Sequence, residues 1–480
     1  MLSLSPEEAE PEVLAGLKEF PNLKELHVTL PGPADQRMRD LGGVKGLEVL
    51  DVNGSGGSDA ALAELARLTH LRELHLGSWQ VTDAGLSHLA KIPGLQSLWL
   101  SNCPASSEGW THLARLPSLR TLGLGGPALS DAGLARAASL GNLRFLCLQL
   151  DTSRVTARGL DPLKRLSRLE KLYLYGPQVS DAGLACLEGM VALKELRLSS
   201  AGVSGAGLKH LKRLTKLEIL SLSGTPVTDA ALQHLQGLAG LQTLELEGTR
   251  LGDEGLKWLA GLTSLRELWL PRTRIRGPGL IHLRACSRLE LLSLQGLPVG
   301  DAELACVRGM EHLRRLELGQ TKVTDAGLAQ LAALRQLEIL NLEGTPISDA
   351  GLEHLAGLAK LADLGLRYTR VGDSGVKRLA ALPALRRLDL RGTAITDASL
   401  PHLEGMDRLD RLLVGGPKLT IEGVEKLQRA LPRTEVVRSS EYLGSPPMMA
   451  PEATPPAAGP REDPRSDSQG GPKPCTSRIC

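Results

Sequence analysis

The sequence predicts an α/β solenoid, with a parallel sheet on its concave side and short helices on its convex side. Three observations predict this fold. A leucine opens a unit every 24 residues, and the same order of apolar and polar positions follows each of these leucines. Apolar residues make up 42% of the 480 residues but aromatic residues only 2%, so aliphatic side chains must fill a long core.

The opening leucines define seventeen repeats. They fall at Leu23, Leu47, Leu71, Leu95, Leu119 and Leu143, and then every 24 residues from Leu169 to Leu409. The interval from Leu143 to Leu169 is 26 residues, because two extra residues lie between Leu148 and Val155. The register of the repeats therefore slips only once, and we expect the extra residues in the turn 149–154.

The unit that opens at Leu217 shows the order of elements within a repeat. Leu220 and Leu222 alternate with residues that point to the other face, as in a strand. After a polar turn, Thr228 and Asp229 precede apolar residues at every third position, which predicts a capped short helix or 3₁₀ segment. Stacked units bury their leucines against one another, and the stack curves because helices are wider than strands.

These features resemble the leucine-rich-repeat family, whose consensus L-x-x-L-x-L-x-x-N/C-x-L is matched over about 23–431 with Thr in the Asn or Cys position. The TDAGL form of the repeat, as at 82–86 and 324–328, is similar to repeats of bacterial proteins and of F-box-associated receptors. We expect no F-box, because only some twenty residues precede the first strand. The Thr hydroxyls are expected to bond to turn backbone groups at Thr225, Thr249, Thr273, Thr321, Thr345, Thr369 and Thr393.

We expect three segments along the chain. Residues 1–20 form an amino-terminal cap, because Leu14, Leu17 and Phe20 fall where the last apolar positions of a preceding repeat would lie. Residues 21–438 form the solenoid. Residues 439–480 contain nine prolines and few large apolar groups, which predicts a disordered tail.

Charge and composition restrict the partners and the compartment. The 56 basic and 54 acidic residues give a formal net charge of +2, which disfavours nucleic acid and anionic membranes as partners. The amino terminus does not resemble a secretory signal, and no apolar run approaches the ~20 residues that a membrane span needs. Seven cysteines without paired close spacings favour reduced thiols. We therefore expect a cytoplasmic monomer.

No residue pattern predicts catalysis, a metal site or a cofactor. Histidines recur at one convex position, but the same position holds Trp258, Cys186 and Cys306 in other repeats, which favours a structural role. These histidines are His88, His112, His210, His234, His282, His354 and His402. Repeated aspartates, such as Asp83 and Asp325, lie at helix starts and are interpreted as caps. The protein is therefore not expected to be an enzyme.

The concave face carries the residues that we expect to bind a partner. Positions two, four and six after each opening leucine should point out from the sheet. Five of the eleven aromatic residues occupy them, among acidic and basic side chains in a mixed order that favours a protein partner. The alternative is that these aromatics only stabilise the sheet through cross-strand pairs. The predicted contact residues are Trp99, Phe145, Cys147, Tyr173, Tyr175, Arg197 and Trp269.

The sequence thus predicts a non-catalytic scaffold or receptor that binds another protein on its concave face. A second interpretation is a substrate-recruiting or regulatory subunit of an enzymatic assembly, such as a ubiquitin-ligase adaptor or an effector. In that case another chain supplies the catalysis.

Overall fold

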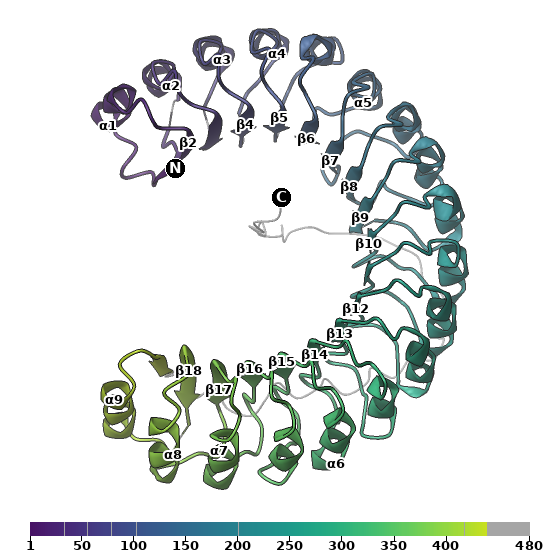
Figure 1. Ribbon diagram of the computed structural model, residues 1–480. Coiled ribbons are helices and arrows are strands. Elements are labelled where there is room, and N and C mark those ends of the chain that lie inside the picture. The colour runs from purple at the N-terminus through teal and green to yellow at the C-terminus, as the bar shows by residue number, and fades with distance from the viewer. Residues whose placement is uncertain are drawn as a thin grey trace, which may run out of the picture. The chain divides into compact units, whose positions relative to one another are not determined.

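The computed structural model describes residues 1–438 except Pro33, Ser55, Ser78, Asn102, Ser200 and Pro417. The tail expected at 439–480 lies outside the described residues. Nineteen strands in the described part form one parallel sheet, in which each strand pairs with the next one along the chain. Figure 1 shows that the strands line the inner side of the repeat unit and that the helices lie on its outer side. The predicted solenoid is confirmed.

The strands contain three to five residues each. They are β1 (Leu2–Leu4), β2 (Glu25–Thr29), β3 (Val49–Asn53), β4 (Glu73–Leu76), β5 (Ser97–Leu100), β6 (Thr121–Gly125), β7 (Phe145–Gln149), β8 (Lys171–Tyr175), β9 (Glu195–Ser199), β10 (Ile219–Ser221), β11 (Thr243–Glu245), β12 (Glu267–Trp269), β13 (Leu291–Ser293), β14 (Arg315–Glu317), β15 (Ile339–Asn341), β16 (Asp363–Gly365), β17 (Arg387–Arg391), β18 (Arg411–Gly415) and β19 (Glu435–Arg438).

Helical segments on the outer side are α-helices near both ends and mainly 3₁₀ segments in the middle. The α-helices are α1 (Pro11–Gly16), α2 (Asp35–Leu41), α3 (Asp59–Leu65), α4 (Asp83–Leu89), α5 (Asp131–Ala137), α6 (Asp325–Leu328), α7 (Asp373–Leu379), α8 (Leu400–Glu404) and α9 (Ile421–Ala430). The 3₁₀ segments are η1 (Leu17–Glu19), η2 (Gly109–Arg115), η3 (Arg158–Arg165), η4 (Gly183–Gly189), η5 (Ala206–Arg213), η6 (Asp229–Leu235), η7 (Asp253–Gly261), η8 (Pro278–Ala285), η9 (Glu303–Val307), η10 (Ala329–Leu331), η11 (Gly351–Leu355) and η12 (Asp397–Ser399).

The sheet keeps identical repeat positions in register along its whole length. Leu220 of β10 pairs with Leu244 of β11, which pairs with Leu268 of β12. Across the two-residue insertion, Leu146 still pairs with Leu172. The extra residues are therefore absorbed in the turn that follows β7, as predicted. Aliphatic side chains, almost all of them less than 3% exposed, form one continuous core between the sheet and the helices.

The first twenty residues contain more than the expected capping helix. Leu2 of β1 pairs with Leu26 of β2, so this segment has the strand and the helix of a repeat. Leu14 and Leu17 are buried in the core, as their spacing predicts. Phe20, however, is 62% exposed, because no further repeat covers it within the structure.

Bridges between successive repeats explain the TDAGL sequence. The Thr or Ser before each helix caps it; for example, Thr396 Oγ1 accepts from Ala398 N at 3.1 Å. The following Asp accepts hydrogen bonds from the backbone N–H and the hydroxyl of the capping residue in the next repeat. Such pairs are Asp35–Ser58, Asp59–Thr82, Asp83–Ser106, Asp131–Thr156, Asp181–Ser204, Asp301–Thr324, Asp325–Ser348, Asp373–Thr396 and Asp397–Thr420.

This finding corrects the sequence-based interpretation of the aspartates. They were expected to accept N–H groups at the start of their own helix, but the N–H groups listed above belong to the next repeat. Asp325, for example, receives Ser348 N at 2.8 Å. Each bridge ties two repeats together with a charge-assisted hydrogen bond.

The glycine two residues after the aspartate makes room for the carboxylate of the preceding repeat. A Cβ at Gly351 would overlap Oδ1 of Asp325, and one at Gly375 would overlap Oδ1 of Asp349. Where Ala231 replaces this glycine, Gly205 replaces the aspartate of the preceding repeat. Where Glu303 replaces it, the preceding aspartate is again a glycine, Gly277. At these places the two positions, 26 residues apart, change together because only one of them has room for a side chain.

The threonines in the turns after the strands behave as predicted. All seven hydroxyls donate to the backbone carbonyl oxygen three residues earlier, at 2.5 to 2.9 Å. Most of these side chains are at most 5% exposed. Each hydroxyl therefore satisfies a polar group of the turn that water cannot reach.

We predict that Gly351→Ala lowers the free energy of unfolding by about 1–3 kcal/mol, because its Cβ would overlap the Asp325 carboxylate. Chemical denaturation measures this change. Gly261→Ala is the control, since nothing lies within 4 Å of its Cβ. The double variant Asp325→Gly, Gly351→Ala imitates the Gly205 and Ala231 pair and should lose less than the sum of the single variants. Additive losses would contradict the steric account.

Candidate functional site

Four aromatic side chains on the concave face lie in contact from β5 to β8, and we call them the aromatic row. The ring centroids of Trp99 and Phe145 are 5.6 Å apart, and those of Phe145 and Tyr173 are 4.7 Å apart. Tyr175 follows at 6.3 Å from Tyr173, and His75 of β4 lies 5.4 Å from Trp99. The Trp99, Phe145, Tyr173 and Tyr175 rings meet edge to face, which is a favourable arrangement for aromatic pairs.

Small residues between the rings allow the row to form. Gly123 of β6 pairs with Trp99 on one side and with Cys147 on the other. A Cβ at Gly123 would overlap the Trp99 indole, so the indole lies over this glycine and reaches toward Phe145. Cys147 is only 1% exposed, so it stands among the predicted contact residues but offers a partner almost no surface.

The row is half-buried rather than fully exposed. Trp99, Phe145, Tyr173 and Tyr175 each keep part of their surface accessible while covering one another. Trp99 Nε1 donates to Ser97 Oγ at 3.1 Å, so its polar atom is already satisfied within the sheet. Mutual packing worth about 0.5–1.5 kcal/mol per aromatic pair lowers the cost of keeping these rings on a surface.

A charged network continues the row on the next strands. Tyr173 Oη donates to Glu195 Oε1 at 2.7 Å, and Arg197 Nε donates to the same oxygen at 2.8 Å. Lys171 lies 3.1 Å from the other Glu195 oxygen. Arg197 also reaches Glu245 of β11 at 3.0 Å, passing over the small Ser221 of β10. Arg197 is therefore held in a fixed position beside the row.

The network shifts the titration of its members. Burial would raise the pKa of Glu195, but hydrogen bonds from Tyr173, Arg197 and Lys171 outweigh it and hold this pKa below its ordinary value. Burial and the neighbouring Glu195 raise the pKa of Tyr173 to about 12. At neutral pH the carboxylate is therefore charged and the phenol is neutral.

The structure brings together six of the seven predicted contact residues, but not Trp269. Trp269 lies on β12, and the strands β9 to β11 separate it from the row. The guanidinium of Arg315 covers its ring at 5.6 Å, across the small Ser293 of β13. Trp269 is thus a separate half-buried position of the same face.

Sequence reasoning did not identify a concave hollow of about 560 Å³ between β14 and β18, which we call the arginine hollow. Its floor includes Gly365, which leaves out one side chain at position four of β16. Its charged lining residues are Arg315, Arg367, Arg387, Arg391, Arg411, Glu317, Glu343, Asp363 and Asp389. A glycine at position four, among arginines that recur at the 24-residue spacing, is the signal that could have revealed it.

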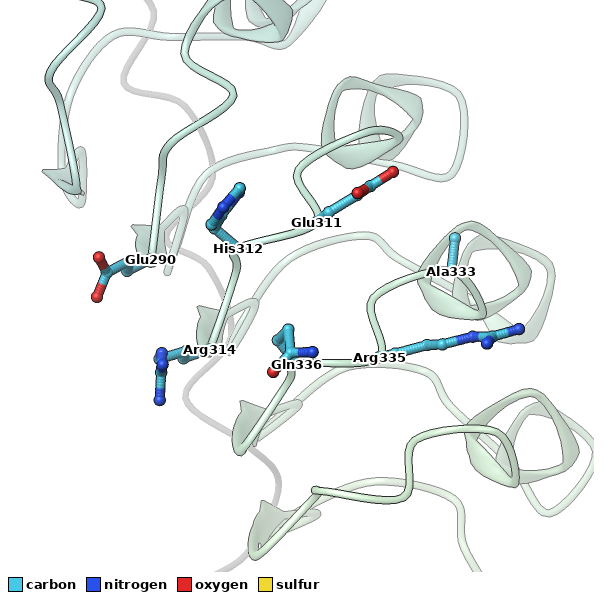
Figure 2. A pocket seen from close by; sticks show the side chains of 7 residues that line it. All are labelled: Glu290, Glu311, His312, Arg314, Ala333, Arg335 and Gln336. Atoms are coloured by element: carbon cyan, nitrogen blue, oxygen red, sulfur yellow. The ribbon is translucent and has the colours of Figure 1, made fainter.

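A second hollow, of about 590 Å³, lies on the flank where the chain returns from the helices to the strands. Figure 2 shows that Glu290 and Arg314 point away from Glu311 and Arg335 instead of converging on one point. Arg314 is already paired with Glu338 at 2.8 Å. This hollow therefore lacks the convergent polar groups of a binding site.

The convex histidines do not form a site with each other. His210 pairs with Glu188 at 2.6 Å between neighbouring repeats. Within the described ranges of 1–438, no group of three or more His, Cys, Asp or Glu side chains is placed to hold a metal ion. In the same part of the chain, none of the helices has the length and apolar character needed to span a bilayer.

Comparisons agree with the repeat geometry. The model of the family described as Leucine Rich repeat matches residues 67–90, 241–260, 309–332 and 334–356. The chain is a leucine-rich-repeat protein, as its sequence predicts; the similarity to F-box-associated repeats is not shown. No match was found among curated proteins.

Solved structures share the fold at low sequence identity. The TLR13–ssRNA13 complex gives a TM-score of 0.57 at 18% identity, covering 88% of this chain and 69% of that chain. A leucine-rich-repeat protein of Leptospira interrogans gives 0.46 at 19% identity, covering 88% and 98% of the two chains. An internalin of Listeria monocytogenes gives 0.45 at 20% identity, covering 72% and 88%.

We predict that the contribution of Glu195 to stability depends on pH. A carboxyl group whose pKa is lowered by folding stabilises the protein above its unfolded pKa of about 4.3, and this stabilisation disappears as the pH falls through the folded pKa. Glu195→Gln should therefore cost about 1–3 kcal/mol at pH 7 and much less near pH 3, in chemical denaturation. Glu267→Gln, on the same face, should show no such dependence. An equal cost of Glu195→Gln at both pH values would refute the prediction.

Proposed function

We propose that this protein is a non-catalytic scaffold or receptor that binds another protein along its concave face, with the aromatic row as the main anchor. The observation that carries the proposal is the row itself. Four half-buried aromatic side chains from β5, β7 and β8 lie together on a rigid sheet, beside a fixed arginine. Aromatic residues and Arg supply most of the binding energy in protein interfaces.

The rigidity of the surface supports the proposal. The rings hold one another and Arg197 is fixed by two carboxylates, so little side-chain entropy remains to be lost on binding. Curved solenoids commonly present such extended concave surfaces to partners. The described residues offer no comparable group of convergent acids, bases and nucleophiles that would favour catalysis instead.

Other partners are less well supported. A structural neighbour is described as a complex with ssRNA, but the mixed charges here and the net charge of +2 do not favour a polyanion. We propose that the protein acts as a cytoplasmic monomer. A recruiting or regulatory subunit of an enzymatic assembly is the second candidate, because such a subunit would use the same protein-binding surface.

Trp99→Ala should lose a partner that the unchanged protein retains, with affinity falling about thirtyfold for ~2 kcal/mol of lost anchoring. Affinity purification with quantitative mass spectrometry identifies the partner, and calorimetry measures the affinity. Trp258→Ala is the matched control, because it removes the same side chain from η7 on the outer side. It should leave binding unchanged.

A second variant separates binding from folding. Thr121→Arg keeps every ring but places a long charged side chain beside Phe145, its partner in the sheet. It should block binding without lowering the melting temperature. If Trp99→Ala and Thr121→Arg both retain the partner, or if Trp99→Ala loses only stability, the aromatic row is structural and the proposed site is wrong.

A further inference from the structure

Two arginines of the arginine hollow face each other across neighbouring strands. Arg387 of β17 and Arg411 of β18 are direct partners in the sheet. Like charges at directly opposite positions of a sheet destabilise it. Both side chains are largely exposed, at 65% and 48%, so their guanidinium groups remain accessible from the hollow.

The carboxylates near these two arginines lie on their outer sides. Arg387 pairs with Asp363 of β16 at 3.5 Å, and Arg411 pairs with Glu435 of β19 at 3.4 Å. At this level of the sheet, the described residues therefore place no carboxylate between the two guanidinium groups. Both ion pairs are also long for charge-assisted hydrogen bonds, so the arginines keep donors for another acceptor.

A second pair of arginines repeats this arrangement one step along the strands. Tyr368 N donates to Arg391 O at 2.9 Å, which places Arg367 next to Arg391 on the neighbouring strand. Arg391 is held by Asp389 through two parallel hydrogen bonds of 2.9 and 2.6 Å. Arg367 is held more loosely, with Glu343 at 3.8 Å and Tyr368 Oη at 3.0 Å.

One donor of Arg367 is left without an acceptor. Its Nε is shielded from solvent and has no hydrogen-bond partner in the described part of the chain. A buried donor of a charged group that makes no hydrogen bond is costly. Together with the opposed Arg387 and Arg411, this atom indicates that the hollow lacks an anionic acceptor. Gly365 leaves space for such an acceptor in the floor.

We propose that the arginine hollow binds an Asp or Glu side chain of a partner protein, with its carboxylate between Arg387 and Arg411 and close to Arg367. Guanidinium groups match a carboxylate in planar, two-pronged hydrogen bonds. The resident acids Glu317, Glu343, Asp363 and Asp389 would repel a polyanion or a doubly charged phosphate more strongly than a single carboxylate. The proposal rests on the proposed function, since the partner would lie along the same concave face.

Fluorescence anisotropy with a defined probe tests the proposal. The probe is a short labelled peptide that alternates Asp and Ser and is amidated at its carboxyl end, and its counterpart has Asn in place of Asp. The full chain should bind the Asp peptide and not the Asn peptide. Arg387→Gln and Arg411→Gln should each weaken binding at least about tenfold. Arg386→Gln, which removes the same charge one residue away on the flank, should change it less than about twofold.

Several outcomes would overturn the proposal. They are no binding of the Asp peptide, equal binding of the Asn peptide, an equal loss with Arg386→Gln, or displacement of the Asp peptide by inorganic phosphate or single-stranded RNA at lower concentration than by unlabelled Asp peptide. Circular dichroism and melting confirm that each variant is folded. Trp99→Ala leaves the hollow intact, so a failed peptide test with a preserved Trp99 effect on the partner would reject only the hollow.

Discussion

The hydrogen bonds from each aspartate to the capping residue of the next repeat are the interaction on which the rest of the structure depends. Thr324, for example, donates both its backbone N–H and its hydroxyl to Asp301, so the start of α6 is fixed to the preceding repeat. The sheet fixes the other side of the same repeat, because every strand pairs with its neighbours. With both sides tied, neighbouring repeats cannot slide or rotate against each other, and side chains of successive strands keep fixed spacings.

Those fixed spacings determine what the concave face can present. Strands about 4.8 Å apart crowd large side chains at the same position. The chain relieves this crowding with small residues: Gly123 beneath Trp99, Ser221 beneath Arg197, Ser293 between Trp269 and Arg315. Large side chains therefore lie over small neighbours and contact the strand beyond. This alternation produces both the aromatic row and the bridge from Arg197 to Glu245.

Features that repeat every 24 residues could be predicted from sequence, because stacking puts equal positions side by side. The strand register, the short helices, the hydroxyl bonds of residues such as Thr249 and most of the aromatic row follow from this rule. The exchange of Asp for Gly205 opposite Ala231 could not be seen within one repeat, because the contact crosses between repeats. The arginine hollow was missed because its charges were considered along the chain, whereas Arg387 and Arg411 matter as neighbours across it.

Hydroxyl-radical footprinting of the free and partner-bound protein tests the central claim most directly, because it reports on aromatic side chains themselves. Binding along the concave face predicts that oxidation of Trp99, Phe145, Tyr173 and Tyr175 falls when the partner binds. Oxidation of Trp258 on the outer side should stay unchanged. Unchanged oxidation of the aromatic row, together with protection of Trp258, would contradict the account and place the partner on the helices.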